Sequence, residues 1–303
     1  MSYSGGFDDA YSARGRGPNL RLIGALILAV IGIAMYLFET QVNPVTGKRQ
    51  HIAMSVDQEK ALGLQAAPEM AAKMGGVLGP DRDPRAALVS EVGRRIVRDS
   101  DASRSPYVGN FHFYLLSDPE TVNAFALPGG QVFITAGLFD RLENEAQLAG
   151  VLGHEIGHVV NRHTAEQMAK SRLGQMLTLA VGVGASGGDD RGRNAQMIAA
   201  LVNQVTQLRF SRDDESEADR FGIQFMAQSG YDPTAMLDVM RILKEESKGN
   251  RQPEFLATHP LPETRLEEIQ ALLQSEYPNG VPPSLSKGRM LEGGRVLGRF
   301  RGE

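Results

Sequence analysis

The sequence predicts an α+β fold that is predominantly helical, contains a small β-sheet and is preceded by one transmembrane helix. Helix-capping residues stand before several segments with an apolar face. One short stretch alternates like a strand beside a Pro-Gly-Gly turn, and an uncharged apolar stretch lies near the N-terminus. The 303 residues, 42% hydrophobic and 22% charged, are ordinary usage for one globular domain with appendages.

The N-terminal region is expected to have three parts. Residues 1–19 are rich in Gly, Ser, Asp and Arg without apolar periodicity, which predicts a disordered tail. Residues 20–38 are predicted to be a transmembrane anchor, because the stretch from Leu22 to Phe38 carries no charge and reaches the lower end of the length a membrane span needs. A cleavable signal peptide is the alternative, but no small-x-small cleavage site follows. Residues 39–52 form a linker.

Charge indicates the orientation of the anchor and the kind of partner. Arg14, Arg16 and Arg21 precede the span, whereas Lys48 and Arg49 follow it closely. The positive-inside rule therefore favours a cytoplasmic N-terminus and an extracytoplasmic domain, periplasmic at the inner membrane of a Gram-negative source. The formal charge of −4 argues against nucleic acid as a partner, and the absence of Cys excludes disulfides and thiolate ligands.

Residues 53–276 are expected to form the folded domain. Ser55 with Gln58 begins one helix, and Asp83 begins a second that ends near Asp99. The apolar run at 111–116 predicts a buried strand.

A hairpin is predicted between Asn123 and Thr135, around the turn Pro128-Gly129-Gly130. If one of its strands lies at a sheet edge, an extended peptide can pair with it through main-chain hydrogen bonds. Asn123, Ala124 and Phe125 are therefore candidate substrate-binding residues. The alternative is a hairpin with a structural role alone.

The motif H-E-x-x-H occurs as His154, Glu155 and His158. Asn144 and Gln147 form a capping pair ahead of it, and the surrounding apolar residues predict a largely buried helix. Two imidazoles four residues apart on a helix lie one above the other and can bind one zinc ion, with the glutamate beside it. The alternative is a chance match on an ordinary helix.

A third ligand is needed, since a catalytic zinc site normally has three protein ligands. Thr164 stands where a metzincin has its third histidine, so that class is excluded. His163 misses the position by one residue and is interpreted as a polar helix-end residue.

An acidic helix downstream offers carboxylates. Glu215 and Asp219 are four residues apart, so Glu215 can bind zinc while Asp219 accepts a hydrogen bond from a ligand histidine. Glu217 is expected to point away from both. The alternative is a solvated helix N-terminus with favourable acidic residues.

Three segments together resemble a known family. They are N-A-F-A-L-P-G-G at 123–130, H-E-I-G-H at 154–158 and E-S-E-A-D at 215–219. In this order they resemble the gluzincin metallopeptidase family of the CAAX prenyl protease and HtpX type, in its periplasmic, membrane-anchored branch, over about residues 51–272. The resemblance implies a zincin-like metalloprotease domain with one zinc ion. It also implies His154, His158 and Glu215 as ligands and Glu155 as the catalytic base.

His259 stands in an H-P-x-x-x-x-R segment that resembles one in periplasmic members of that family. Its imidazole could stabilise the oxyanion of a tetrahedral intermediate, or it could occupy the open position on zinc and inhibit the enzyme. The alternative is a helix-entry residue ahead of Pro260.

The remaining segments carry weaker expectations. Two apolar stretches, 173–185 and 195–210, are predicted to be helices packed over the active site. The glycine-rich connection at 184–194 is either a mobile lid or a plain surface loop. Residues 277–303 are predicted to be a flexible C-terminal tail because they hold few apolar residues.

The expected function is zinc-dependent hydrolysis of peptide bonds in a membrane-anchored enzyme. Glu155 is expected to act as general base toward protein or peptide substrates, such as misfolded or envelope proteins. The alternative is a zinc-bound chaperone or scaffold for envelope proteins whose site is closed and largely inactive.

Overall fold

The computed structural model describes residues 20–181, 209–248, 253–260, 263–293 and 295–299. The predicted tail at 1–19 and the connection at 184–194 lie outside these residues. The first part of the chain forms α1 (Leu20–Phe38), β1 (Thr40–Val42), β2 (Arg49–His51), α2 (Val56–Lys73), β3 (Val77–Leu78), α3 (Pro84–Asp99), two short 3₁₀ helices (Asp101–Arg104 and Val108–Asn110), β4 (His112–Leu116), β5 (Ala124–Leu127), β6 (Gln131–Thr135) and α4 (Ala136–Phe139). The second part forms α5 (Glu145–Val160), α6 (His163–Val181), α8 (Arg212–Gln228), α9 (Ala235–Glu246), α10 (Phe255–Thr258), α11 (Glu263–Glu276), β7 (Arg289–Glu292) and β8 (Arg295–Arg299). The predicted α+β class with mainly helical content is confirmed.

Three helix starts predicted from capping residues are confirmed. The side chain of Ser55 accepts from the backbone N–H of Gln58 in a capping box at α2, and Asp83 caps α3. Asn144 accepts from Gln147 at the start of α5. These local bonds satisfy backbone donors that a helix leaves free at its N-terminus, which explains why the sequence alone located them.

A four-stranded sheet has the order β3-β4-β6-β5. The predicted hairpin is its antiparallel β5–β6 pair, with Phe125 opposite Phe133, while β4 runs parallel to β6. The rings of Phe125 and Tyr114 stack on Phe133 from either side, each with centroids 4.8 Å apart. Strand β5 therefore lies at one edge of this sheet.

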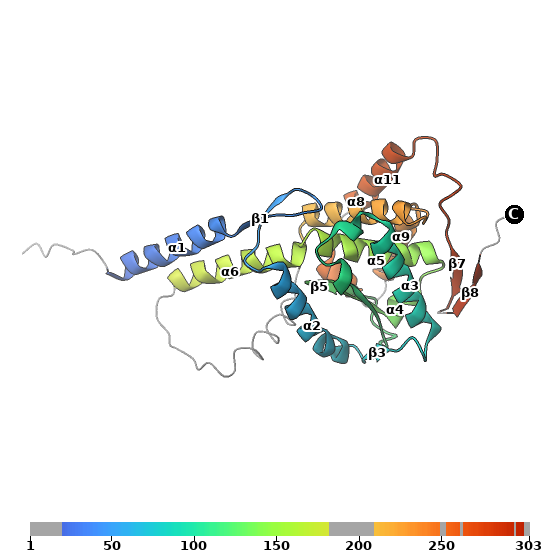
Figure 1. Ribbon diagram of the computed structural model, residues 1–303, viewed down its shortest axis with the longest axis horizontal. Coiled ribbons are helices and arrows are strands. Elements are labelled where there is room, and N and C mark those ends of the chain that lie inside the picture. Colours follow the sequence, from blue (N-terminus) through green and yellow to red (C-terminus); the bar gives the residue numbers. More distant parts are fainter. Residues whose placement is uncertain (1–19, 182–208, 249–252, 261–262, 294, 300–303) are drawn as a thin grey trace, which may run out of the picture.

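Helix α5 is the centre of the domain (Figure 1), and all of its residues are buried. It packs against α3, α8 and α9 and against the β5–β6 hairpin. These neighbours explain the composition of α5, because a helix that is covered on every side needs apolar or small residues on all of its faces. The histidines of H-E-x-x-H consequently face a closed interior.

The crossing of α5 and α8 depends on glycine. A Cβ on Gly157 would lie 2.9 Å from the backbone oxygen of Ala218, and a Cβ on Gly222 would lie 3.0 Å from the backbone nitrogen of His154. Gly153 faces Gly222 in the same way, with 3.2 Å to its backbone oxygen. Small residues at a crossing allow two backbones to approach closely, and here they bring the acidic turns of α8 onto the histidine face of α5.

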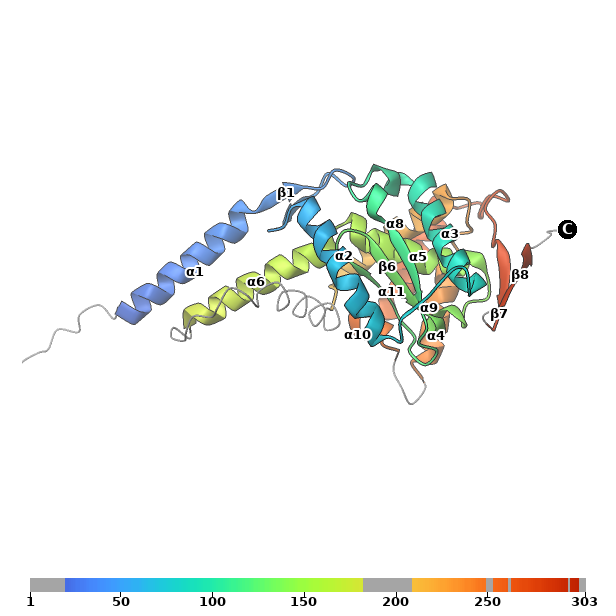
Figure 2. The ribbon, with the colours of Figure 1, turned by 60° about the horizontal axis from the view of Figure 1, so that its bottom comes forward.

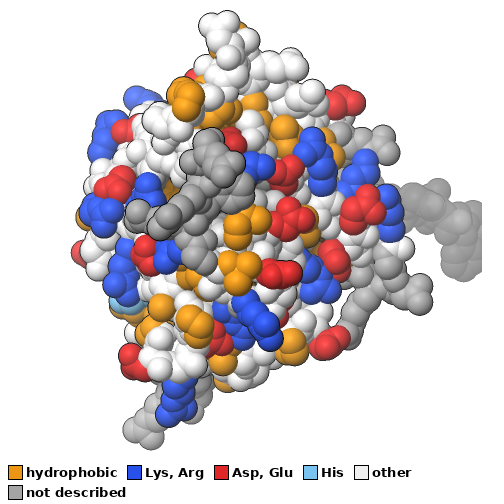
Figure 3. Space-filling view, turned by 90° about the vertical axis from the view of Figure 1, so that its right-hand side faces the viewer, with side chains coloured by type: hydrophobic (Ala, Val, Ile, Leu, Met, Phe, Trp, Pro, Cys, Tyr) orange, Lys and Arg blue, Asp and Glu red, His pale blue; other side chains and the backbone are white. Residues whose placement is uncertain are grey.

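The N-terminal end of α5 is held by residues predicted to be a flexible tail. The backbone N–H of Ala146 donates to the carbonyl of Lys287 over 3.0 Å, and Arg289 Nε donates to Glu145 Oε2 over 2.7 Å. The segment predicted to be a flexible tail contains β7 and β8, and it supplies the cationic partner that the largely buried carboxylate of Glu145 needs. Figure 3 shows the described part of this end of the molecule, where acidic and basic side chains are interspersed.

The C-terminal end of α5 is held by the predicted linker, which forms the β1–β2 hairpin. Asn43 Nδ2 donates to the carbonyl of Val160 over 2.7 Å, and Gln50 Nε2 donates to the carbonyl of Asn161. The last carbonyls of a helix have no partner within it. Both side chains are buried, so the hairpin supplies the hydrogen bonds that water supplies at an exposed helix end.

A buried ion pair fixes the chain as it leaves α5. Arg162 adopts a left-handed backbone conformation, with φ of 59°, which costs free energy for a residue with a side chain. Its guanidinium pairs with Glu59 of α2 and donates to the carbonyl of Met54. Tyr107 donates to the second oxygen of Glu59 over 2.7 Å. These bonds hold the turn that directs the chain from α5 into α6.

Helices α1 and α6 lie side by side and project from the domain (Figures 1 and 2). Apolar side chains of α1, among them Leu26, Ile27 and Val30, are exposed. Within the described ranges, no helix combines the length and the apolarity that crossing a membrane requires, so the predicted transmembrane anchor at 20–38 is not confirmed. The apolar stretch 173–185 is expected to pack over the active site, and its described part continues α6 along α1 as far as Val181. The rest of this stretch, and the stretch 195–210 up to residue 208, lie outside the described residues.

The glycine contact predicts a specific loss of stability. Gly157→Ala places a methyl group against the Ala218 backbone, so we expect the free energy of unfolding to fall by about 1–3 kcal/mol, as in overpacked cores. Urea unfolding followed by circular dichroism measures the change. Gly150→Ala on the same helix is the control, because its Cβ would meet only side-chain atoms at 3.6 Å or more. Equal stability of the two variants would contradict the role of this contact.

Candidate metal centre

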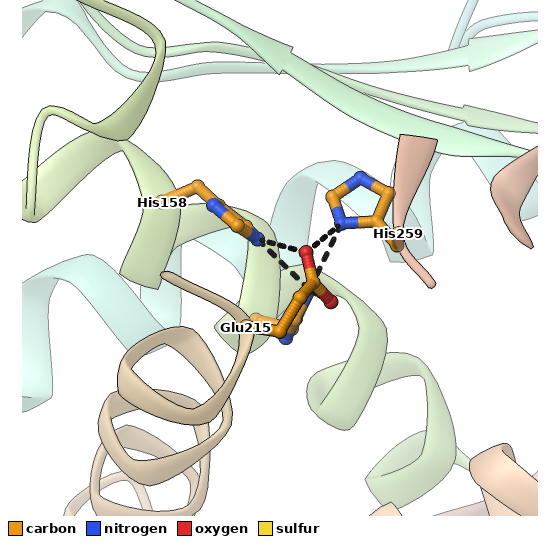
Figure 4. Close-up of side chains that lie close together, drawn as sticks. His158, Glu215 and His259 are labelled. Atoms are coloured by element: carbon orange, nitrogen blue, oxygen red, sulfur yellow. Dashed lines mark hydrogen bonds and ion pairs between the residues drawn. The ribbon is translucent and has the colours of Figure 1, made fainter. Parts of the chain in front are cut away.

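Four side chains from three parts of the chain converge in the core. His154 and His158 come from successive turns of α5, Glu215 from the first turn of α8, and His259 directly follows α10. One ligand atom from each lies within 4.8 Å of all the others, and no member is more than 2% exposed. Figure 4 shows His158 and His259 directed at the Glu215 carboxylate from opposite sides. The structure thus brings together the three predicted ligands and the additional histidine.

The separations of the donor atoms fit a zinc ion. Ligand atoms around a tetrahedral zinc, with bonds of about 2.0–2.1 Å, are about 3.4 Å apart. His154 Nε2 lies 3.0 Å from His158 Nε2 and 3.6 Å from Glu215 Oε2, and His158 Nε2 lies 3.4 Å from Glu215 Oε1. Imidazole nitrogens with one carboxylate are also the donor set of catalytic zinc sites. The cluster can therefore bind a metal ion of this kind.

Asp219 orients the first histidine. His154 Nδ1 lies 2.9 Å from Asp219 Oδ1, and a carboxylate can only accept, so the proton is on Nδ1 and the lone pair of Nε2 faces the cluster. Arg265 donates to both oxygens of Asp219, over 2.6 and 2.8 Å, and its Nη1 lies 2.5 Å from Glu215 Oε2. One buried guanidinium thus holds the two acidic turns of α8 in place.

Glu155 lies beside the cluster and outside its ligand set. It is 1% exposed, and its Oε1 has no hydrogen-bond partner among the described residues, with His259 Nε2 at 3.6 Å. Burial raises the pKa of Glu155 above its usual value. A buried carboxylate oxygen without a donor is uncommon in folded proteins, and here it is free to receive a proton.

The protonation states of His158 and Glu215 suit metal binding. Burial holds the pKa of the His158 imidazole well below its usual value, so this ring is neutral. Burial would raise the pKa of Glu215, but His259 and Arg265 outweigh it and hold that pKa well below the usual value. For Asp219, Arg265 similarly outweighs burial, and the pKa is lowered. Neutral imidazole and ionised carboxylate are the forms that bind a metal.

The predicted substrate-binding residues lie at the edge strand. Asn123 directly precedes β5, its backbone N–H donates to Thr135 Oγ1, and its buried Oδ1 has no partner among the described residues. Ala124 and Phe125 begin β5, which pairs with β6 on one side. The side chain of Phe125 belongs to a core cluster, and all four residues of β5 are buried.

Two residues of the site were not identified from the sequence. Arg265 is the last residue of the H-P-x-x-x-x-R segment that begins at His259, and the sequence does not indicate its role. In the structure it is fully buried between two carboxylates. His163 is at a helix end, as interpreted, because it is the first residue of α6. It is also fully buried, and its Nδ1 lies 2.9 Å from His158 Nδ1, a contact that the sequence did not indicate. Its position five residues after His158 was the one available signal.

Glu217 lies outside the cluster, as predicted. Its carboxylate contacts side chains of the protein as well as solvent. Its Oε2 lies 3.3 Å from His163 Nε2 and accepts from Lys48 Nζ over 2.8 Å. The hydrogen bond from His163 is the main reason that the pKa of Glu217 falls to about 2. This carboxylate therefore remains ionised beside the metal centre.

Comparison with known proteins agrees with this geometry. The chain is 32% identical over 265 residues to the beta-barrel assembly-enhancing protease of Yersinia pestis, covering 85% of this chain and 52% of that protein. It is 35% identical over 212 residues to the protein of the same name from Escherichia coli K12, covering 67% and 42%. It is 32% identical over 253 residues to the mitochondrial metalloendopeptidase OMA1 of Schizosaccharomyces pombe, covering 83% and 71%. The chain spans about half the length of the two bacterial relatives.

The family model of peptidase family M48 matches residues 84–273. This range contains all four members of the metal cluster, together with Glu155, Asp219 and Arg265. The predicted resemblance to gluzincin metallopeptidases is confirmed, and the chain belongs to peptidase family M48.

Proposed function

We propose that this protein is a zinc-dependent endopeptidase in which Glu155 is the general base. The observation that supports this most directly is the unpaired Glu155 oxygen beside a buried cluster of three histidines and Glu215. His154, His158 and Glu215 hold one zinc ion, and Asp219 orients His154. When bound, zinc supplies Lewis-acid activation of water and of the scissile carbonyl.

Glu155 performs the proton transfers. Its carboxylate takes a proton from the attacking water and later delivers a proton to the leaving amine. A raised pKa suits both steps, because a base whose pKa approaches the working pH can also release the proton it has gained.

The substrate is proposed to be an extended segment of a protein. The outer edge of β5, with the backbone of Asn123, Ala124 and Phe125, pairs with it by strand addition. Main-chain pairing depends little on the amino-acid sequence of the substrate. It does require that the paired segment be unfolded. Misfolded or envelope proteins meet this requirement, and a relative named as a beta-barrel assembly-enhancing protease supports the choice.

His259 is proposed to be an inhibitory ligand. Its Nδ1 lies 2.9 Å from Glu215 Oε1 and 3.3 Å from His154 Nε2, which is within the ligand set and leaves no room for a water molecule between these atoms. Full burial of the cluster also indicates a closed state. Activity then requires His259 to withdraw from the zinc position.

The location is proposed to be a membrane surface, with the domain on the extracytoplasmic side. The exposed apolar side chains of α1 support membrane association. Arg14, Arg16 and Arg21 precede the uncharged stretch that starts at Leu22, whereas Lys48 and Arg49 follow it, which supports a cytoplasmic N-terminus.

A second function is favoured by the closed geometry. With His259 as a permanent fourth ligand, the protein would act as a zinc-bound chaperone or scaffold for envelope proteins. The two proposals differ in whether purified, zinc-loaded protein cleaves an unfolded substrate and whether that cleavage requires Glu155.

Glu155→Gln tests the general base. The variant should bind zinc as the wild type does, since Glu155 is not a ligand, and cleavage of casein should fall by at least about 100-fold. Zinc content and casein cleavage measured on the same preparation separate the two properties. Cleavage at the wild-type rate would reject the role of Glu155, and absence of cleavage by both the wild type and His259→Ala would favour the scaffold.

His154→Ala tests the ligand set. Removal of one of three ligands should eliminate both stoichiometric zinc and proteolysis, which elemental analysis and the casein assay measure. His112→Ala is the control, because His112 is exposed on β4 away from the cluster. Wild-type zinc content in the His154 variant would argue against ligation.

His259→Ala distinguishes the two roles considered for this histidine. If His259 holds the site closed, casein cleavage should increase several-fold while zinc content is retained by the other three ligands. A decrease in cleavage at unchanged zinc content would instead assign His259 to stabilisation of the oxyanion.

A further inference from the structure

His163 and Glu217 continue a chain of contacts outward from the metal cluster. His163 is the first residue of α6, and the left-handed turn at Arg162 places its ring against His158. His158 Nδ1 and His163 Nδ1 are 2.9 Å apart, and His163 Nε2 is 3.3 Å from Glu217 Oε2. Lys48 in the β1–β2 hairpin then donates to the same oxygen.

The direction of each hydrogen bond in this series follows from its last acceptor, the carboxylate of Glu217. The Glu217 carboxylate can only accept, so His163 carries its proton on Nε2 and presents a lone pair at Nδ1. The Nδ1 of His158 must then be the donor, because two lone pairs 2.9 Å apart would repel each other, and this side of the ring faces away from the cluster, where no cation would lie between them. A neutral His158 with its proton on Nδ1 has its lone pair on Nε2, the atom in the metal cluster.

We propose that His163 is a positioning residue, which together with Glu217 fixes the tautomer and ring orientation of His158 and thereby strengthens metal binding. The arrangement parallels Asp219, which acts on His154 directly. For His158 the carboxylate acts through an intervening imidazole. This proposal rests on the proposed zinc site.

A role for His163 as a further ligand does not fit the contacts. Its Nδ1 faces the Nδ1 of His158, on the side of that ring opposite the cluster, and its Nε2 faces carboxylate oxygens, with Asp214 Oδ1 at 3.9 Å besides Glu217. A purely structural role is also insufficient, since an apolar side chain would fill the space and leave the Nδ1–H of His158 without an acceptor, which is costly in a buried site.

The test compares two substitutions at His163. Leu fills the position without an acceptor, whereas Gln offers a carbonyl to His158 and an amide N–H to Glu217. We expect His163→Leu to weaken zinc binding by about 10–100-fold, as for other residues that orient metal ligands, and His163→Gln to remain within a few-fold of the wild type. Competition with a chromogenic chelator gives the zinc affinity, and circular dichroism of the apoproteins checks folding.

A spectroscopic measurement separates positioning from packing. In zinc-loaded protein labelled with ¹⁵N at histidine, the His158 Nδ1–H proton should give a downfield signal that persists in His163→Gln and shifts or exchanges away in His163→Leu. Wild-type zinc affinity in His163→Leu, or equal weakening by Leu and Gln, would overturn the proposal. Failure of the wild type itself to bind zinc would overturn the proposed function instead.

If His163→Leu does not fold, substitutions of Glu217 test the same proposal. Glu217→Gln keeps a carbonyl acceptor for His163 Nε2–H, and Glu217→Leu removes it, at a position only partly buried. Both lose the same charge, so weaker zinc binding in Leu than in Gln reports the loss of the carbonyl acceptor that faces His163 and Lys48. Asp213→Leu, at an exposed position of α8, controls for a general effect of the substitution on the helix. Equal zinc affinity in the Leu and Gln variants of Glu217 would overturn the relay.

Discussion

The close approach of α5 and α8 is the constraint on which the rest of the site depends. The histidines lie on α5, and Glu215 and Asp219 lie on α8, so the metal cluster exists only where these two helices nearly touch. Glycines at 153, 157 and 222 allow that approach. Helices with larger side chains at the contact are 8–10 Å apart, and carboxylates on short side chains do not extend far. The residues without side chains are therefore as necessary to the site as those that bind.

Charge compensation is the second requirement of this core. Glu155, Glu215 and Asp219 are all buried within one small region, and isolated buried carboxylates are very unfavourable. Arg265 contacts two of them, and His259 lies near the third. A divalent cation would supply the remaining positive charge. The same electrostatics that stabilise the fold thus create a strong preference for a metal ion at this position.

The part of the site that the sequence predicted is the part specified by local spacing. The i, i+4 pairs His154–His158 and Glu215–Asp219 are set by helix geometry, and the cap at Asn144 located the helix of the two histidines. Arg265 and His163 could not be assigned roles, because their partners lie on other helices and no local pattern reports that contact. The membrane anchor and the C-terminal tail were judged from composition, which says nothing of the pairing between Arg289 and Glu145 that orders the tail.

The helix that carries H-E-x-x-H is fastened at its two ends by segments from opposite parts of the chain. The β1–β2 hairpin accounts for two carbonyls at its C-terminal end, and the carbonyl of Lys287 accepts from the backbone N–H of Ala146 at its N-terminal end. Since synthesis proceeds from the N-terminus, α5 leaves the ribosome long before its second fastening exists. The helix that carries the histidines is therefore held at both ends only after nearly the whole described domain has been synthesised.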